Sequence, residues 1–154
     1  RQMCIRDSFG TGQFWQERLE ALTSHVVLDT LQAVEPLGPK KLVSALVIAP
    51  CTGATLARLA AGISDTPVTL AAKSLLRVGC PVVVGVSTND GLGASWENMA
   101  RLYQRKHYYF VPYGQDDPNT KPQSLKARFE LLPQTLEAAL EERQLQPVLQ
   151  CPCG

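Results

Sequence analysis

This 154-residue sequence has few aromatic residues and almost no net charge. Phe, Trp and Tyr make up 6% of it, and 15 Lys and Arg against 14 Asp and Glu leave a formal net charge of +1. A near-neutral balance lacks the basic excess of a typical nucleic-acid binder, and a hydrophobic share of 45% is too high for a disordered chain. We therefore expect one folded domain that does not bind nucleic acid.

Long apolar runs and a cysteine framework are also lacking. No run approaches the ~18 residues of a membrane span, so we expect no membrane segment and a cytoplasmic location. The five cysteines are odd in number and without framework spacing, and Cys151-Pro-Cys153 is too isolated for a zinc knuckle. We predict reduced thiols and no metal site. Cys51 has no adjacent base, which favours a small packing residue over a nucleophile.

The two ends of the chain differ in character from its middle. Residues 1–8 (RQMCIRDS) show neither helical nor strand periodicity and resemble peptides translated from sequencing-adapter DNA. We interpret residues 1–8 as a non-native leader, residues 9–149 as a single domain and residues 150–154 as a tail.

Helical and strand patterns alternate through the middle. Apolar runs predict strands at residues 25–28, 42–49, 81–86 and 108–111, while apolar periodicity and capping residues predict helices at 12–22, 55–62, 67–78, 95–105 and 124–142. We expect a rigid turn at 35–39, a polar loop at 112–122, and a kink or break of the last helix at Pro133. This alternation is typical of an α/β layered domain with a parallel sheet.

Ligands of such sheets bind at the carboxyl ends of the strands, where three loops lie. The loop from Pro50 to Thr55 places two hydroxyls and a glycine between a buried strand and a helix start. Free backbone N–H groups and the dipole at a helix N-terminus attract anions, so Thr52 and Thr55 are candidates to hold a phosphate or carboxylate. The alternative is that a threonine only caps the helix.

The other two loops carry weaker signals. Ser87-Thr-Asn-Asp90 could orient a polar ligand, or could form ordinary hydroxyl and Asx turns. The paired Asp116 and Asp117 in the third loop are typical of a solvated turn, since a metal site would need further ligands.

Six motifs in order resemble one family. The sequence from about Phe9 to Leu149 is similar to the family of dipicolinate synthase B subunits from spore-forming bacteria. The motifs that carry this resemblance are Glu35-Pro-Leu-Gly-Pro-Lys40, Ile48-Ala-Pro-Cys-Thr-Gly53, Ser87-Thr-Asn-Asp90, Tyr109-Phe-Val-Pro112, Gly114-Gln-Asp-Asp-Pro118 and Leu145-Gln-Pro-Val148.

The resemblance implies a fold and a role. It implies a Rossmann-like, flavoprotein-like three-layer α/β fold, with a parallel sheet, helices on both faces, and the first strand–helix–strand unit missing from this sequence. It implies an oxidoreductase in the mother cell of a sporulating bacterium. There, this protein and the NAD(P)-binding A subunit of dipicolinate synthase would together oxidise a dihydrodipicolinate-type precursor to dipicolinate, as a hetero-oligomer.

The resemblance also implies where a ligand would bind. Related flavin-dependent cysteine decarboxylases carry Pro-Ala-Ser-Ala-Asn-Thr where this sequence has Pro50-Cys-Thr-Gly-Ala-Thr55, and Pro-Ala-Met-Asn where it has Val86-Ser-Thr-Asn89. The carry-over places cofactor-binding residues at Pro50, Thr52, Gly53, Thr55, Ser87 and Asn89, with Asn89 across the cleft, and assigns no catalytic residue. Their asparagine falls on Ala54, which argues against cysteine decarboxylation and weakens the expectation of an FMN site.

Two alternative functions stay open. One is a non-catalytic partner that stabilises the A subunit, and the other is an FMN-binding, decarboxylase-like flavoprotein. Without the first strand of the family, an inner apolar strand would have an exposed edge, so we predict that residues 9–149 alone aggregate.

Overall fold

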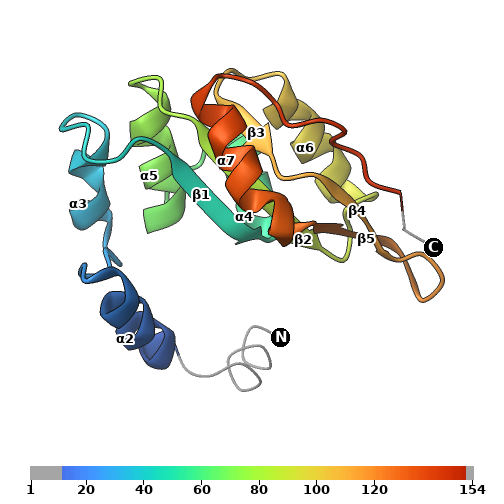
Figure 1. Cartoon of the computed structure of the whole chain (residues 1–154), viewed down its shortest axis with the longest axis horizontal. Coiled ribbons are helices and arrows are strands. Elements are labelled where there is room, and N and C mark those ends of the chain that lie inside the picture. Colours follow the sequence, from blue (N-terminus) through green and yellow to red (C-terminus); the bar gives the residue numbers. More distant parts are fainter. Residues whose placement is uncertain (1–11, 152–154) are drawn as a thin grey trace.

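The computed structural model describes residues 12–151, and the interpretation of residues 1–8 as a leader lies outside this range. The helices are α2 (Gly12–Thr23), α3 (Leu31–Val34), α4 (Gly53–Ala61), α5 (Pro67–Leu76), α6 (Ala94–Tyr103) and α7 (Leu132–Leu140), with 3₁₀ turns η1 (Glu35–Leu37) and η2 (Phe129–Leu131). The strands are β1 (Leu46–Cys51), β2 (Val82–Thr88), β3 (Tyr108–Phe110), β4 (Tyr113–Asp117) and β5 (Lys121–Ala127). Figure 1 shows a central sheet with helices packed on it.

Strand β2 lies at the centre of the sheet and changes partner along its length. It pairs in parallel with β1 on one side, and its first half, Val82–Val84, pairs in parallel with β3 on the other. Beyond Val84, the place of β3 is taken by β5, which runs antiparallel to β2 at Ser87 and Thr88. Strand β4 then pairs antiparallel with β5. The sheet is therefore mainly parallel at its core, with an antiparallel hairpin added at the carboxyl end of β2.

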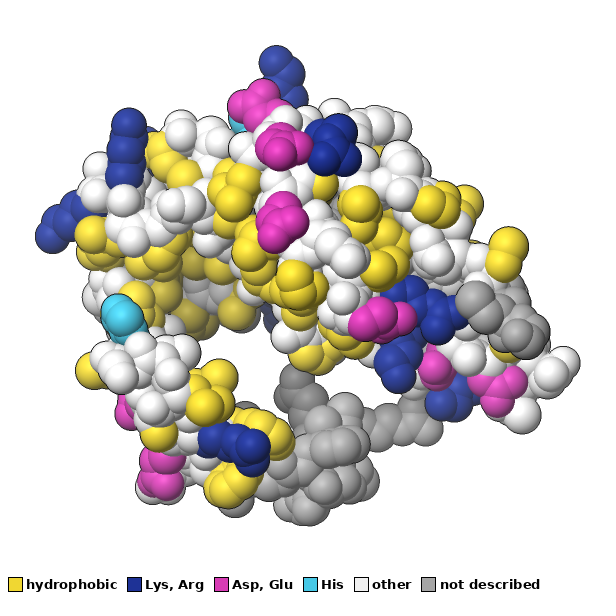
Figure 2. Space-filling view, in the orientation of Figure 1, with side chains coloured by type: hydrophobic (Ala, Val, Ile, Leu, Met, Phe, Trp, Pro, Cys, Tyr) yellow, Lys and Arg dark blue, Asp and Glu magenta, His cyan; other side chains and the backbone are white. Residues whose placement is uncertain are grey.

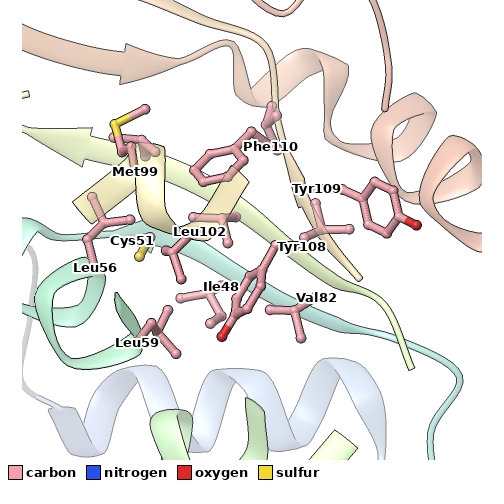
Figure 3. Close-up of a cluster of buried hydrophobic side chains, with 14 of the residues drawn as sticks. Ile48, Cys51, Leu56, Leu59, Val82, Met99, Leu102, Tyr108, Tyr109 and Phe110 are labelled. Atoms are coloured by element: carbon pink, nitrogen blue, oxygen red, sulfur yellow. The ribbon is translucent and has the colours of Figure 1, made fainter. Parts of the chain in front are cut away.

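Helices cover both faces of the sheet. Helices α4, α5 and α6 pack on one face, and α7 packs against β2 and β3 on the other, which confirms the predicted α/β class. The alternation of a strand is visible at β3, where Tyr108 and Tyr109 point to opposite sides (Figure 3). The core is built mainly from apolar side chains of β1, β2, β3, α4 and α6.

Several predicted elements are confirmed near their expected bounds. The apolar run at 81–86 forms β2, the run at 108–111 forms β3, and α6 falls within the helix expected at 95–105 to within a residue. Helix α5 begins as expected: Pro67 occupies its first turn, and Thr66 and Thr69 form a reciprocal capping box. Helix α4 ends at Gly62, which adopts a left-handed conformation with φ of 74°.

The end of the chain corrects two predictions. The segment 112–122 is not a loop throughout, and 124–142 is not one long helix, because residues 113–117 and 121–127 form the β4–β5 hairpin. Leu125 and Ala127 are buried while Lys126 between them is exposed, which is the alternation of a half-covered strand. Pro133 lies in the first turn of α7, where its missing N–H costs nothing, so it starts the helix instead of kinking it.

Two other strand predictions are wrong in part or in full. Residues 25–28 form no regular strand, and Val26 is 77% exposed. Strand β1 begins at Leu46, four residues later than expected, and continues through Pro50 to Cys51. Pro50 is accommodated because the pairing with β2 shifts register between Ile48 and Cys51.

The amino-terminal part of the described chain exposes apolar surface. Helix α2 buries none of its residues, and yellow apolar side chains lie open on it in Figure 2. Phe14, Trp15, Leu19 and Leu22 are all at least 41% exposed. Strand β1 pairs only with β2 among the described strands, so its outer edge has no strand partner there. Within residues 12–151 no helix is long and apolar enough to cross a membrane.

Candidate functional site

The turn between β1 and α4 leaves the helix N-terminus open. Thr52 is the N-cap residue of α4, yet its side chain accepts no hydrogen bond from the first-turn backbone N–H groups. Its hydroxyl instead lies 3.3 Å from the hydroxyl of Thr55. The alternative that a threonine hydroxyl only caps the helix is therefore not supported by the contacts of Thr52. The two hydroxyls and the uncapped N–H groups together form a set of donors suited to an anionic group.

Gly53 brings this turn against the end of β2. A Cβ atom at Gly53 would lie 2.8 Å from Ser95 Oγ, 3.0 Å from Thr88 Oγ1 and 3.2 Å from Asp90 Oδ1. The three side chains form one cluster, because the hydroxyls of Thr88 and Ser95 donate to Asp90 Oδ1 over 2.6 and 2.7 Å. Only glycine leaves room for this contact between the first turn of α4 and the loop after β2.

Asp90 gives the site a resident negative charge. Hydrogen bonds from Thr88, then Ser95, hold the pKa of its carboxyl below the ordinary value of 3.8, so it is ionised at neutral pH. Its position beside the α4 N-terminus is favourable for a carboxylate. Both neighbouring hydroxyls are committed to it, so the donors left for a ligand are those of Thr52, Thr55 and the helix backbone.

Cys51 precedes this turn but faces away from it. Its side chain is fully buried among Leu56, Leu59 and Leu102, between α4 and α6 (Figure 3). Burial raises the pKa of the thiol to about 12. A protonated, inaccessible thiol is no nucleophile, in agreement with its interpretation as a packing residue.

The structure separates Ser87 and Asn89, which the sequence placed in one loop. Ser87 is still in β2 and lies directly opposite Lys126 of β5. Asn89 is exposed and lines a hollow of about 400 Å³ with Lys121, Pro122 and Gln123 of the hairpin. Of the six expected site residues, Thr52, Gly53 and Thr55 lie together at the α4 turn. Ser87 and Asn89 lie beside β5 instead. Pro50 is exposed in β1.

A second hollow near Ser87 was missed from the sequence. It has a volume of about 450 Å³ and is lined by Gly114, Gln115, Asp116, Lys126, Ala127, Arg128, Phe129 and Glu130. The sequence predicts a helix at 124–142, whereas Lys126 lies in β5 and Arg128 directly follows this strand, so that both line the hollow. No group of three or more His, Cys, Asp or Glu side chains among residues 12–151 is arranged to hold a metal ion.

Comparison with known protein families includes the part of the chain that forms this site. A family model described as Flavoprotein matches residues 7–108, which include β1, α4, β2 and the cluster around Gly53. The chain belongs to the Flavoprotein family. This membership agrees with an α/β fold whose ligand turn follows a central strand.

Two individual relatives identify a more specific family for this chain. The B subunit of dipicolinate synthase from Bacillus subtilis (strain 168) is 48% identical over 141 residues, which cover 92% of this chain and 70% of the relative. A crystal structure of the dipicolinate synthase B subunit from Bacillus halodurans superimposes with a TM-score of 0.88 at 46% identity, covering 93% of this chain and 73% of that one. The chain is thus a member of the family of dipicolinate synthase B subunits, as its six motifs indicated.

A more distant structure shows the fold alone. The FMN-dependent cysteine decarboxylase SpaF matches with a TM-score of 0.61 at 22% identity, covering 89% of this chain and 74% of its own. The likeness supports the flavoprotein-like Rossmann-type architecture.

The residues of this Flavoprotein chain fit part of a flavin nucleotide. The open donors at Thr52, Thr55 and the first turn of α4 suit a phosphate group. Ala54, exposed beside them, has no side-chain donor or acceptor.

Proposed function

We propose that this chain is the B subunit of a dipicolinate synthase and contributes its α4 turn to ligand binding in an oxidoreductase complex. Two motifs of the resemblance, at residues 48–53 and 87–90, meet around this turn and the end of β2. The single observation that carries the proposal is the open α4 N-terminus, where Thr52 leaves the helix uncapped and Thr55 lies beside it. The 48% identity to a dipicolinate synthase B subunit supports the assignment of the reaction.

The chemistry proposed is the oxidation of a dihydrodipicolinate-type precursor to dipicolinate. The ring would lose a hydride to an NAD(P)⁺ held by the A subunit and a proton to solvent. Because the product ring is aromatic, the step is downhill, and the protein's main task is to position donor and acceptor. A turn rich in N–H and O–H donors is suited to anchoring an anionic group of either reactant.

A second candidate, flavin binding, is favoured by the Flavoprotein match together with the same open turn. Thr52, Gly53 and Thr55 would hold the phosphate of FMN. When bound, FMN supplies a two-electron acceptor. The purified full-length protein should then be yellow and should release FMN on denaturation, whereas a colourless protein that does not bind added FMN excludes this candidate.

The test of the proposed function combines the two purified proteins. The full-length protein, with and without its A subunit, is supplied with precursor and NAD(P)⁺, and dipicolinate is followed by its absorbance. We expect synthesis only from the mixture. Thr52→Val and Thr55→Val should each lower kcat/KM about tenfold or more, since a hydrogen bond to a charged group contributes ~1.5–3 kcal/mol.

Thr23→Ala provides the control, because Thr23 is exposed at the end of α2 and its hydroxyl bonds only locally to Leu19 and His25. It should leave the rate unchanged. Undiminished synthesis by the A subunit alone would remove this chain from the chemistry. Normal synthesis by both valine variants, with loss of activity only when the complex itself is disrupted, would identify a non-catalytic stabilising partner instead.

A further inference from the structure

The hollow between the β4–β5 hairpin and η2 combines two cations with an aromatic ring. Lys126 ends the pairing of β5 with β2, Arg128 lies just beyond the end of β5, and both side chains line this hollow. Neither side chain has an ion pair or a side-chain hydrogen bond to another described residue. Phe129 supplies an aromatic wall of the same hollow.

Glycine at position 85 allows this wall to lie against the sheet. A Cβ atom on Gly85 would stand 2.9 Å from Phe129 Cε1, so the ring rests directly over the β2 backbone. Ser87, two residues along β2, projects to the same face as Gly85 and lies opposite Lys126. The cationic side chains therefore border the carboxyl end of β2, where the fold class binds its ligands.

The charged lining residues are two acidic and two basic, and the ion pair of Asp116 with Lys121 outside the lining leaves a small excess of positive charge. Asp116 lies 3.6 Å from Lys121 Nζ and is neutralised in part by this ion pair. Glu130 is the remaining acidic lining residue, and it is exposed. Figure 2 shows Lys and Arg side chains gathered with a few acidic ones over this end of the molecule, at the lower right.

We propose that this hollow binds a small planar ring that carries two carboxylates. A volume of about 450 Å³ is within the range of small-molecule pockets and exceeds what one small ring requires. Lys126 and Arg128 each face one carboxylate, and the Phe129 ring stacks on the planar ligand. The choice of ligand rests on the proposed function, whereas the site itself rests on the hollow and the three side chains of Lys126, Arg128 and Phe129 that line it.

The test measures binding to the full-length protein by calorimetry, with pyridine-2,6-dicarboxylate, pyridine-2-carboxylate and inorganic phosphate as probes. The dicarboxylate should bind best and should weaken as salt is raised. Lys126→Gln and Arg128→Gln should each weaken it about tenfold, while Glu130→Gln should tighten it by removing a like charge. Lys40→Gln, at an exposed position that does not line this hollow, is the matched control and should change affinity little.

Three results would overturn the inference: equal affinity for one and two carboxylates, phosphate binding as tightly as the dicarboxylate, or unchanged affinity in both glutamine variants. Melting temperatures of all variants, whose altered residues are at least partly exposed, verify that the fold is retained. Synthesis in the presence of the A subunit is measured in parallel. Normal synthesis together with unaltered binding in both glutamine variants would reject this site but not the proposed function. Failure of synthesis in every mixture would reject the proposed function, and the site would then be tested by the binding measurements alone.

Discussion

At the scale of single residues, Gly53 determines how closely the ligand turn approaches the loop after β2. It is the one position in this turn where a side chain would meet Thr88, Asp90 and Ser95 at once. Part of this could be foreseen: the sequence pointed to Thr52, Gly53 and Thr55 by their place after an apolar run. It could not reveal that Asp90 occupies the other side of Gly53, because no local pattern links two residues so far apart in the chain.

Gly53→Ala should destabilise the protein by about 1–3 kcal/mol and lower the rate of synthesis, because the added methyl must displace the hydroxyls bound to Asp90. Urea unfolding measures the first effect and the coupled assay the second. Gly12→Ala, where a Cβ atom meets nothing within 4 Å, should leave both unchanged. Wild-type stability in Gly53→Ala would show that the cluster moves freely.

Asp90 predicts a pH dependence of stability. Its folded-state pKa lies below the ordinary 3.8, so its stabilising effect is present above that value and is lost as the pH falls through the lower, folded-state pKa. Asp90→Asn should therefore be less stable than wild type at neutral pH, and the difference should shrink below pH 3.8. Urea unfolding at a series of pH values measures this. In a background of Thr88→Val and Ser95→Ala, the pH dependence of that difference should be much smaller, because the two largest causes of the lowered pKa are removed. An undiminished pH dependence would assign the pKa shift to another cause.

At the scale of elements, the strands β2 and β3 and the helices α5 and α6 were predictable because each has strong local signals. The run 81–86 is apolar throughout, and the helix at Pro67 has a cap, a proline and a terminal glycine in order. The β4–β5 hairpin was missed for a physical reason. Gly114, Asp116 and Asp117 disfavour strands, and residues 124–132 have good helix formers, so only pairing with β2 makes this segment extended.

The turn at 35–39 was predicted to be rigid, and the structure adds the contact that anchors it. Ser74 of α5 accepts a hydrogen bond from the Gly38 N–H over 3.1 Å and donates one to the Glu35 carbonyl over 3.0 Å. Ser74→Ala should cost about 1–3 kcal/mol, because it leaves a buried N–H without its partner. Thermal unfolding tests this, and Ser64→Ala, which removes no described hydrogen bond, should change stability by less than about 0.5 kcal/mol. Equal effects of the two changes would contradict the anchoring role.

At the scale of the whole molecule, the described chain has one open flank. The outer edge of β1 has no strand partner among residues 12–151, and Val47 is 36% exposed on it. An unpaired apolar edge favours pairing between copies, so the present sequence should self-associate.

A single charge on that edge tests this expectation. Val47→Lys should raise the soluble, monomeric fraction of the present 154-residue chain in size-exclusion chromatography, because a lysine disfavours edge-to-edge pairing. Lys40→Gln, at an exposed position outside β1, is the control and should not help. A sharp monomer peak from the unmodified sequence would show that the edge is not adhesive.

The change of partner along β2 has a consequence for how such proteins diversify. The hairpin joins the sheet only beyond the last residue that β3 contacts, so the three parallel strands are complete without it. Its tip can lengthen, shorten or change composition over evolutionary time at little cost to the architecture. Exchanging the hairpin between homologues should therefore change ligand binding without altering the pairing of the parallel strands, as long as the buried Tyr113, Leu125 and Ala127 are kept.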